Sequence, residues 1–411
     1  MKKILASILL AVSTPLAAQA RPDAPPANEV LHWNRAVTDA FARAQWDPLT
    51  ESRALAIVQL AVHDALTHAP CVEQGEFGFS TDAAVAAAAH DATIGLLPAA
   101  AAALDAELAR SLQAIADGKA GKQGVAIGRA SAAHWLAARA HDGADRKVEV
   151  PAGTRPGEYR PTPPDLTPAW MAQWGTLLPF ALRTPAQFRP SAPPAVDSAL
   201  AHRDVEQVRR VGGQTGALRT AEQTAIAQFW NENSGQGSNR IARVVAEAQK
   251  LDAPQSARLF ALLNAAMADG YIAMMEAKYH YLYWRPVTAI RAAGAGDWLS
   301  FLPTPPIPDY PSGHSVIGAA AATVLARFFA DDFIAFETTS GQPYAGITRK
   351  FASFSAAAQE NAASRVLAGI HFPTAVRVGL QVGEQIGDWA FDHALPATGA
   401  QGAPAEEMAR R

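Results

Sequence analysis

Alanine-rich stretches in which apolar residues recur at helical spacing run through most of the chain. They cover residues 52–68, 103–115, 124–140, 196–211, 220–230, 238–249, 253–283, 315–329, 355–367 and 375–391. An apolar stripe that repeats every three to four residues is buried when one helix packs on another. Alternation with a period of two, which is typical of strands, is scarce. The sequence therefore predicts an all-α protein built from packed helical bundles.

Proline-rich segments divide these helical stretches. Residues 151–196 are crowded with proline and aromatic residues, and residues 298–310 form a second proline-rich loop. Because proline removes a backbone donor and blocks helices, the first segment predicts a long ordered wrap. We expect an N-terminal helical half with this wrap over residues 21–200, a second half over residues 201–395, and a flexible tail over residues 396–411.

The first twenty residues have the three parts of a secretory signal peptide. Lys2 and Lys3 form a positive region, an apolar stretch follows, and residues 18–20 (Ala-Gln-Ala) resemble a cleavage site. This pattern indicates export to the periplasm or secretion. No second apolar run is long enough to span a membrane. The only cysteine is Cys71, so the chain can form no internal disulfide and its stability must come from packing.

Overall charge and size narrow the classes of partner. The formal net charge is -3, so the chain lacks the basic excess with which proteins bind nucleic acids. Its 411 residues can bury one large core or two fused helical ones. We therefore expect small-molecule substrates, no nucleic acid and no membrane span. The sequence is compatible with an oligomer.

Three short segments in the second half carry the residues best suited to chemistry. In chain order they contain Lys278 and Arg285-Pro286, then Pro311-Ser312-Gly313-His314, then Ser364-Arg365 and His371. Lys278 and Arg285 are two helical turns apart, so we expect both cations to project from one helix face. Arg365 and His371 are six residues apart, and we expect them to face a common centre near the end of a helix.

The middle segment lies where the second proline-rich loop meets an apolar helix. A helix N-terminus presents free backbone N–H groups and a partial positive charge to an anion. Gly313 allows close approach of the backbone, and Ser312 adds a hydroxyl donor. The three segments together supply three cations, these donors and the imidazoles of His314 and His371. Because unpaired buried charges are costly, the expected ligand is a tetrahedral oxyanion such as vanadate or phosphate.

Each segment alone has a plainer interpretation. Lys278 and Arg285 could form a solvated helix face, the Ser-Gly-His sequence could be a helix cap, and His371 could be a structural histidine. The three segments in this order, at these spacings, favour one pocket over three unrelated features.

The motifs K-x6-RP, PSGH and SR-x5-H resemble the three-part signature of the vanadium haloperoxidase and type 2 phosphatidic acid phosphatase superfamily. The first half adds HWNRAVTDAF and PGEYRPTPPDLTPAWMAQWGTLLPF, and residues 229–244 add FWNENSGQGSNRIARV. These segments resemble bacterial vanadium-dependent haloperoxidase-like proteins. The small acid phosphatases of the superfamily generally lack so large an N-terminal half.

The resemblance implies a role for each matching residue. His371 would be the axial ligand of vanadium, and His314 the acid or base at the apical oxygen. The remaining residues would hold the oxyanion, the cations at its equatorial oxygens and the others as hydrogen-bond donors: Lys278, Arg285, Arg365, Ser312 and the Gly313 N–H.

Two positions depart from the family pattern. Many members carry an acidic residue four positions after the last histidine, where it can orient the imidazole, and this chain has Ala375 there. Another acid or a carbonyl would have to take over that role for His371. Haloperoxidases often place an aromatic residue or a histidine five positions before the serine, and this chain has Ile307.

One pocket of this kind serves two chemistries. With vanadate as cofactor, the resemblance implies a haloperoxidase that oxidises halide with hydrogen peroxide. Without it, His371 would attack a phosphomonoester and form a phosphohistidine, while His314 protonates the leaving alcohol, as in an acid phosphatase. The resemblance of the first half favours the haloperoxidase. A non-catalytic oxyanion-binding protein is a third interpretation, although mere binding needs no histidines.

Overall fold

The computed structural model describes residues 28–67, 78–115 and 118–395. Over these residues the chain forms thirteen α-helices, two 3-10 helices and one two-stranded sheet, which confirms the predicted all-α class. The first half contains α1 (Glu29–Ala44), α2 (Pro48–Thr67), α3 (Thr81–Leu96), η1 (Pro98–Ala100), α4 (Ala101–Gln113), α5 (Lys119–Ala138) and η2 (Ala172–Thr176). The second half begins with α6 (Ala199–Val211), α7 (Ala221–Phe229), α8 (Ser234–Ala248), α9 (Ala253–Tyr281) and α10 (Pro286–Ala292). It ends with α11 (Gly313–Phe329), β1 (Phe336–Thr339), β2 (Thr348–Phe351), α12 (Phe354–Leu367) and α13 (Pro373–His393).

Several expectations concern residues outside these ranges. The signal peptide of residues 1–20, the tail of residues 396–411 and Cys71 all lie outside the described part of the chain.

Helix starts follow the capping residues that the sequence supplies. Thr220 and Gln223 form a capping box at the start of α7, and Asp252 and Gln255 form another at the start of α9. In each box two backbone N–H groups without a helical partner receive side-chain acceptors. The starts of these helices are therefore encoded locally.

The stretches predicted from periodicity do not include α1, α3, α10 or the two-stranded sheet. Helix α3 is mostly alanine and is buried on most of its surface, so it has no polar face to mark a period. Helix α10 has seven residues, and β1 and β2 have four each, paired antiparallel from Phe336 opposite Phe351. Segments this short give no clear periodic signal.

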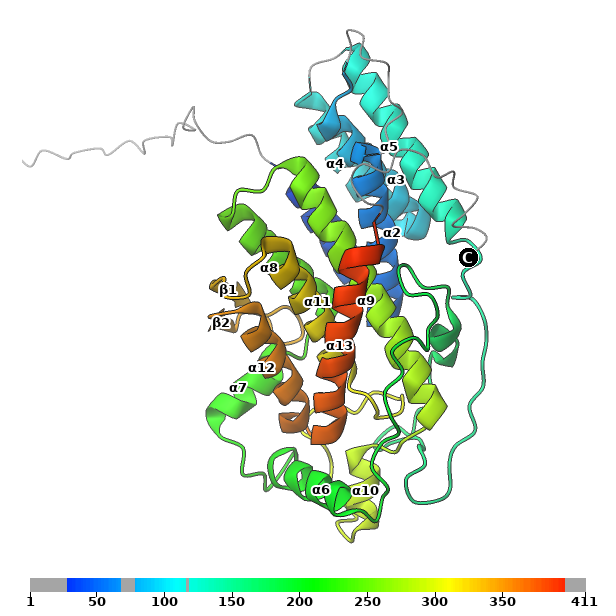
Figure 1. Cartoon of the computed structure of the whole chain (residues 1–411), viewed down its shortest axis with the longest axis vertical. Coiled ribbons are helices and arrows are strands. Elements are labelled where there is room, and N and C mark those ends of the chain that lie inside the picture. The colour runs from blue at the N-terminus through cyan, green and yellow to red at the C-terminus, as the bar shows by residue number, and fades with distance from the viewer. Residues whose placement is uncertain (1–27, 68–77, 116–117, 396–411) are drawn as a thin grey trace, which may run out of the picture.

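The long helix α9 runs through the middle of the molecule, beside α2 of the first half and α11 and α13 of the second (Figure 1). Helix α3 packs between α2 and α5, and α12 packs against α11. One hydrophobic core contains buried residues of both halves, from Val30 to Leu395. The two predicted halves are therefore continuous through their packing.

Glycines let two helix pairs come close together. A Cβ atom on Gly128 of α5 would lie 2.3 Å from the Ala84 carbonyl oxygen of α3. A Cβ atom on Gly383 of α13 would lie 2.3 Å from the Val316 carbonyl oxygen of α11. Both distances are far below van der Waals contact, so the α3–α5 and α11–α13 pairs require glycine at these positions.

Tyrosines at the end of α9 fasten the proline-rich wrap. The Tyr281 hydroxyl donates to the Pro190 carbonyl at 2.5 Å, and the Tyr283 hydroxyl, just beyond the helix, donates to the Pro194 carbonyl at 3.1 Å. The Asp269 carboxylate, buried in the middle of α9, accepts from three consecutive backbone amides of the wrap, Phe180, Ala181 and Leu182. Apart from the short helix η2, the segment is thus held in place by side chains of α9 and its C-terminal end rather than by regular secondary structure.

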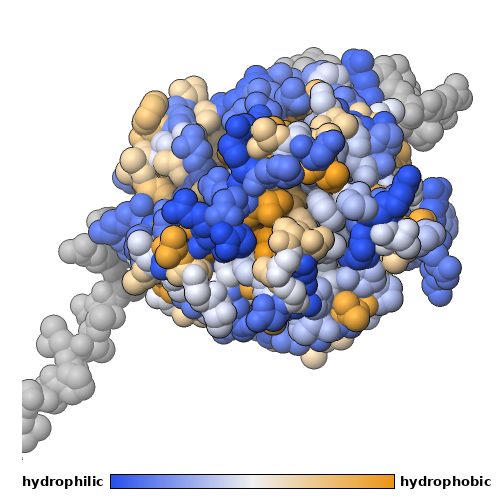
Figure 2. All heavy atoms as spheres, turned by 90° about the horizontal axis from the view of Figure 1, so that it is seen from below, coloured by the Kyte–Doolittle hydropathy of each residue, from blue (hydrophilic) through white to orange (hydrophobic). Residues whose placement is uncertain are grey.

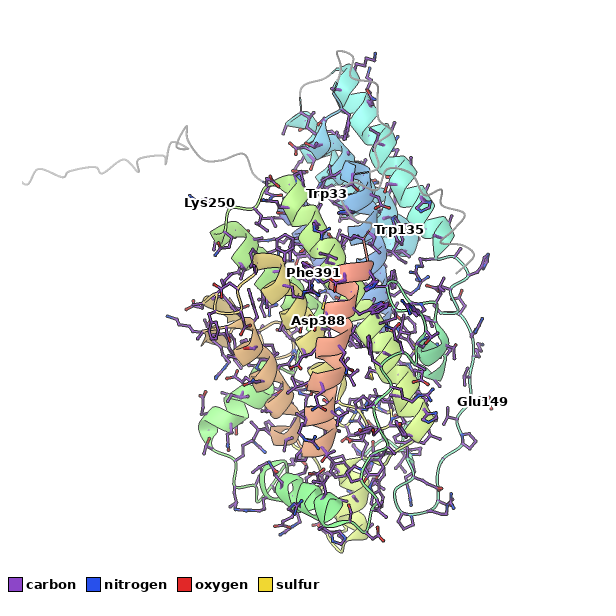
Figure 3. All side chains as sticks on the ribbon, viewed as in Figure 1. Trp33, Trp135, Glu149, Lys250, Asp388 and Phe391 are labelled. Carbon is purple, nitrogen blue, oxygen red and sulfur yellow. The ribbon has the colours of Figure 1, made fainter. Side chains whose placement is uncertain are left out.

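Polar side chains also link the helices of the first half. Trp135 of α5 donates to the Asp64 carboxylate of α2 at 2.7 Å. Trp33 of α1 donates to the Ser111 hydroxyl of α4 at 3.1 Å and to the Glu29 carboxylate of its own helix at 2.8 Å. Both tryptophans are labelled in Figure 3. These indoles are polar groups that packing alone would leave unsatisfied.

The face at the lower end of Figure 1 is mostly hydrophilic, with a group of hydrophobic residues near its centre (Figure 2). Among the helices of the described residues, none combines the length and the hydropathy needed to cross a bilayer.

Candidate oxyanion site

Lys278 lies in the last turn of α9 and is fully buried. Its Nζ donates to the Pro308 carbonyl at 2.7 Å and to the Asp309 carbonyl at 2.8 Å. These bonds use two of its three N–H groups and leave one for a ligand. Burial, reinforced by the charge of Arg285, holds the pKa of Lys278 well below its ordinary value.

Arg285 reaches the same place by a different route from the one predicted. Helix α9 ends at Tyr281 because Leu282 is left-handed, with φ 49°, so Lys278 and Arg285 do not share one helix face. Arg285 instead caps the start of α10, where Pro286 suits the first helical position. The expectation of one face was wrong because the chain turns between the two cations, and this turn directs both into one centre.

The guanidinium of Arg285 is fully buried and only partly satisfied. Its Nε donates to the Ile307 carbonyl and its Nη1 to the Ile370 carbonyl, both at 2.7 Å. Its Nη2 has no hydrogen-bond partner within the described part of the chain. A buried, charged donor without an acceptor is unfavourable, so this atom marks a place for a ligand.

Ser312 and Gly313 stand at the N-terminus of α11. The Ser312 amide donates to the Ala375 carbonyl at 3.0 Å, which joins this turn to the start of α13. The Ser315 hydroxyl donates to the Ser312 hydroxyl at 2.9 Å, so the Ser312 proton is available for another acceptor. A Cβ on Gly313 would meet only the Met274 side chain, at 3.4 Å, so packing within the protein does not require glycine there.

His314 follows in the first turn of α11 and is partly exposed. Its Nε2 lies 3.3 Å from the Glu232 carbonyl oxygen. Burial of the ring, followed by the charge of Arg365, lowers the pKa of His314 to about 3, against the effect of the Glu232 and Trp230 carbonyls. The imidazole is therefore neutral in the ligand-free protein near pH 7.

Arg365 lies in the last turn of α12 and is almost completely buried. Its Nε donates to the Ser364 hydroxyl at 2.9 Å, and its Nη2 lies 3.4 Å from the Ala227 carbonyl. Burial lowers the pKa of Arg365 to about 9. No carboxylate in the described residues offsets that effect, so this charge is poorly compensated.

His371 occupies the bend between α12 and α13, after Gly369 with φ 80°. Burial holds the pKa of His371 well below its ordinary value, and four neighbouring groups act in the same direction: Arg285, Lys278, Arg365 and His314. Arg285 Nη1 lies 3.1 Å from His371 Nε2, and the Ser312 amide bonds the Ala375 carbonyl four residues after His371, so the three sequence segments approach one place. The predicted site residues therefore form a single cluster.

Asp309 is the residue that the sequence analysis missed. It is fully buried in the second proline-rich loop, and its Oδ1 lies 2.9 Å from His371 Nδ1 and 3.8 Å from Arg285 Nη1. Burial raises the pKa of Asp309 to about 7, although Arg285 and Lys278 oppose this rise. The available signal was an acid three residues before Ser312 in a chain that has Ala375 at the usual acidic position.

The charge balance of the cluster suits an anion. Lys278, Arg285 and Arg365 are buried together, and Asp309 is the acid that acts on Lys278 and Arg285. Buried charges that lack partners cost several kcal/mol each, so a multiply charged oxyanion would relieve the imbalance. The open Arg285 Nη2 and the free N–H of Lys278 provide donors for it. The residues therefore fit vanadate, or phosphate of the same shape.

Comparisons with known proteins point to vanadium haloperoxidases. Residues 258–398 match the family model described as the VCPO second helical-bundle domain. A bacterial vanadium-dependent iodoperoxidase has a similar structure, with a TM-score of 0.78 and 26% identity over 89% of this chain and 96% of that one. The chain is similar to vanadium haloperoxidases in its overall fold and, over residues 258–398, to the second helical-bundle domain of that group.

Further relatives show how far the family likeness extends. The vanadium chloroperoxidase of Curvularia inaequalis is 29% identical over 28% of this chain, and the match covers 27% of that relative. A bacterial vanadium-dependent chloroperoxidase has a similar fold, with a TM-score of 0.67 and 21% identity over 85% of this chain and 94% of that one. The vanadium haloperoxidase fold thus extends over both halves, and the family model covers all three motif segments.

Proposed function

We propose that this protein is a vanadate-dependent haloperoxidase that oxidises a halide with hydrogen peroxide. The observation that carries the proposal is the cluster around His371. The buried cations Lys278, Arg285 and Arg365 all act on the His371 imidazole, as does His314; among the described residues Asp309 is the acid at that ring, and Arg285 Nη2 has no partner. Such a pocket binds a tetrahedral oxyanion and also holds groups able to ligate a metal and move a proton.

In this proposal the cations and donors hold vanadate by its oxygens. Arg285 and Arg365 contribute planar forks that suit an oxyanion, and Lys278 contributes the N–H group that the loop carbonyls leave free. The Ser312 hydroxyl and the Gly313 amide add neutral donors at the start of α11. His371 would be the protein ligand to vanadium.

The remaining chemistry divides between cofactor and protein. Bound vanadate supplies Lewis-acid activation of hydrogen peroxide, so that a halide ion can attack it. The cations neutralise negative charge that develops at the reacting oxygens. His314, neutral before the anion binds, would accept and return a proton beside the bound anion. An adjacent anion favours the imidazolium form, which moves the pKa of His314 upward toward the working range.

Support for the haloperoxidase over the acid phosphatase comes from the relatives. The iodoperoxidase resembles this chain over 89% of its length, including the first half. The phosphatase reaction would use the same residues, with His371 as the nucleophile toward phosphorus and His314 as the acid for the leaving alcohol. The two activities therefore need separate assays on the same protein.

The test uses protein loaded with orthovanadate and supplied with hydrogen peroxide. Chloride, bromide and iodide are offered in turn with a phenolic dye whose halogenation changes its colour. We expect halogenation with at least one halide, dependent on vanadate and lost in His371→Ala and Arg285→Ala. A matched control, Arg243→Met, removes another buried arginine and should keep the activity. Inactivity with all three halides, together with vanadate-inhibited hydrolysis of a chromogenic phosphomonoester, would establish the phosphatase instead.

We further propose that the protein is exported to the periplasm or secreted, which the signal-peptide pattern of residues 1–20 supports. Fractionation of a bacterial host that expresses the full chain tests this proposal. Recovery of unprocessed protein from the cytoplasm alone would overturn it.

A further inference from the structure

We propose that Asp309 is the positioning residue for His371, in place of the acid that Ala375 does not provide. The proposal rests on the proposed function, because it assigns His371 the role of ligand to vanadium. Asp309 precedes the histidine in the chain and belongs to another element, the loop before α11. Carboxylate support of the imidazole has thus moved from the start of α13 to that loop.

The distances around the His371 ring define its tautomer. Nδ1 lies 2.9 Å from Asp309 Oδ1, and Arg285 Nη1 lies 3.1 Å from Nε2 and 3.4 Å from Nδ1. Arginine can only donate, so the ring nitrogen that faces Nη1 must carry a lone pair. A carboxylate accepts, so the nitrogen that faces Asp309 must carry the proton. Because Arg285 Nη1 is within reach of both ring nitrogens, the choice falls to Asp309, which selects the tautomer with Nδ1 protonated and leaves the Nε2 lone pair for the nearer Arg285 contact.

This tautomer is the one that a metal ligand requires. A histidine that binds a metal through one nitrogen usually donates its other N–H to a carboxylate or carbonyl, which fixes the ring and raises its basicity. In this chain the Nε2 lone pair lies beside Arg285, on the side of the clustered cations. The Asp309 carboxylate thus keeps the coordinating nitrogen directed at the bound anion.

Asp309 is itself firmly held. Its amide donates to the Tyr283 carbonyl at 3.0 Å, and its own carbonyl accepts from Lys278 Nζ at 2.8 Å. Its carboxylate oxygens form no hydrogen bond of normal geometry with any group in the described ranges, and the donors beside it are His371 Nδ1 at 2.9 Å and the Phe372 backbone amide. A buried carboxylate in this state needs a partner, and the imidazole provides one.

Electrostatics alone and the positioning role predict opposite changes in vanadate affinity for the same variant. Asp309→Asn removes a negative charge from an anion pocket, which by electrostatics alone should tighten every anion. If Asp309 acts through His371, the same change should weaken vanadate about 10- to 100-fold, as loss of an outer partner of a metal ligand does. Inorganic phosphate, bound by the cations without coordination to His371, should bind the variant at least as tightly as the wild type.

The experiment measures the Kd of orthovanadate and of inorganic phosphate by titration calorimetry on the full chain. The matched control is Asp204→Asn, a buried acid that accepts from the Thr374 amide of α13 and should leave both constants unchanged. In a His371→Ala background, Asp309→Asn should no longer weaken vanadate. Vanadate affinity that stays constant or rises together with phosphate affinity in Asp309→Asn would overturn the proposal.

A second readout needs neither vanadate nor turnover. Nitrogen-15 NMR of the histidines, with the His371 signals assigned by their loss in His371→Ala, reports which ring nitrogen carries the proton. We expect Nδ1 protonation in the wild type and in Asp204→Asn, and a mixture of tautomers in Asp309→Ala. If the wild type binds no vanadate, the proposed function fails while this measurement still judges Asp309. A protonated Nε2 in the wild type would overturn the positioning role alone.

Discussion

Removal of Arg365 should weaken vanadate binding without the usual penalty for changing a buried side chain. Burial lowers the pKa of this arginine to about 9 without a compensating acid among its causes. Since a change of one in pKa equals about 1.4 kcal/mol, the ligand-free protein bears a cost of up to about 5 kcal/mol for this charge. Arg365→Met keeps the length of the side chain and removes the charge.

Two hydrogen bonds disappear with the charge, those to the Ser364 hydroxyl and the Ala227 carbonyl. At about 1 kcal/mol each they offset part of the gain. We therefore expect the free energy of unfolding of ligand-free Arg365→Met to stay equal to that of the wild type or to rise by up to about 3 kcal/mol. Vanadate binding should weaken by about 2–5 kcal/mol, the usual effect of removing one partner of a buried charge pair.

Equilibrium unfolding in urea, followed by tryptophan fluorescence with and without orthovanadate, measures both effects. Vanadate at a hundred times its Kd should stabilise the wild type by about 2.7 kcal/mol and the variant by much less. Arg243→Met, a buried arginine bonded to Asn34 and Thr38, should retain the full vanadate response. A loss of 3 kcal/mol or more in the ligand-free Arg365 variant, or an unchanged vanadate response, would refute the reasoning.

Three further predictions concern the scaffold. Asp269→Asn should lower the free energy of unfolding by about 2–4 kcal/mol, because the new NH₂ group opposes one of the three wrap amides that the carboxylate accepts. The control Asp388→Asn, at an exposed ion pair, should change it little. Equal effects of the two variants in urea unfolding would contradict this prediction. Burial raises the pKa of Glu51 from 4.5 to about 8. Between these two pH values the folded chain keeps a proton that the unfolded chain has lost, so the free energy of unfolding falls as the pH rises from about 4.5 to about 8. Glu51→Gln lacks this titration, so its free energy of unfolding relative to that of the wild type should grow by up to about 1.4 kcal/mol per pH unit between pH 5 and 8. A difference in urea unfolding that stays constant over this range would contradict the raised pKa of Glu51. Gly383→Ala should separate α13 from α11, lower the free energy of unfolding by roughly 1–3 kcal/mol and weaken vanadate binding. A thermal melt and a vanadate titration that both match the wild type would contradict the prediction.

The sequence determined the helical class and pointed to the cations and imidazoles of the pocket, although not to Asp309. Helical periodicity and capping boxes are local properties, so the starts of α7 and α9 follow from nearby residues such as Thr220 and Asp252. Packing alone does not explain so many cations and imidazoles in three short segments. Their residue types therefore indicated an anion site before their positions were known. Helix α3 escaped detection because a helix buried all round carries no polar face.

Tertiary structure alone decided how these residues meet. The left-handed Leu282 ends α9 and turns the chain, so Lys278 and Arg285 reach one centre from two helices. The partner of His371 is likewise set by the placement of a loop far from it in sequence, which brings Asp309 to 2.9 Å from its Nδ1. Spacing along a chain predicts contacts only within one regular element. Contacts between elements depend on where each helix ends and how the next one packs, and that is fixed by the whole core.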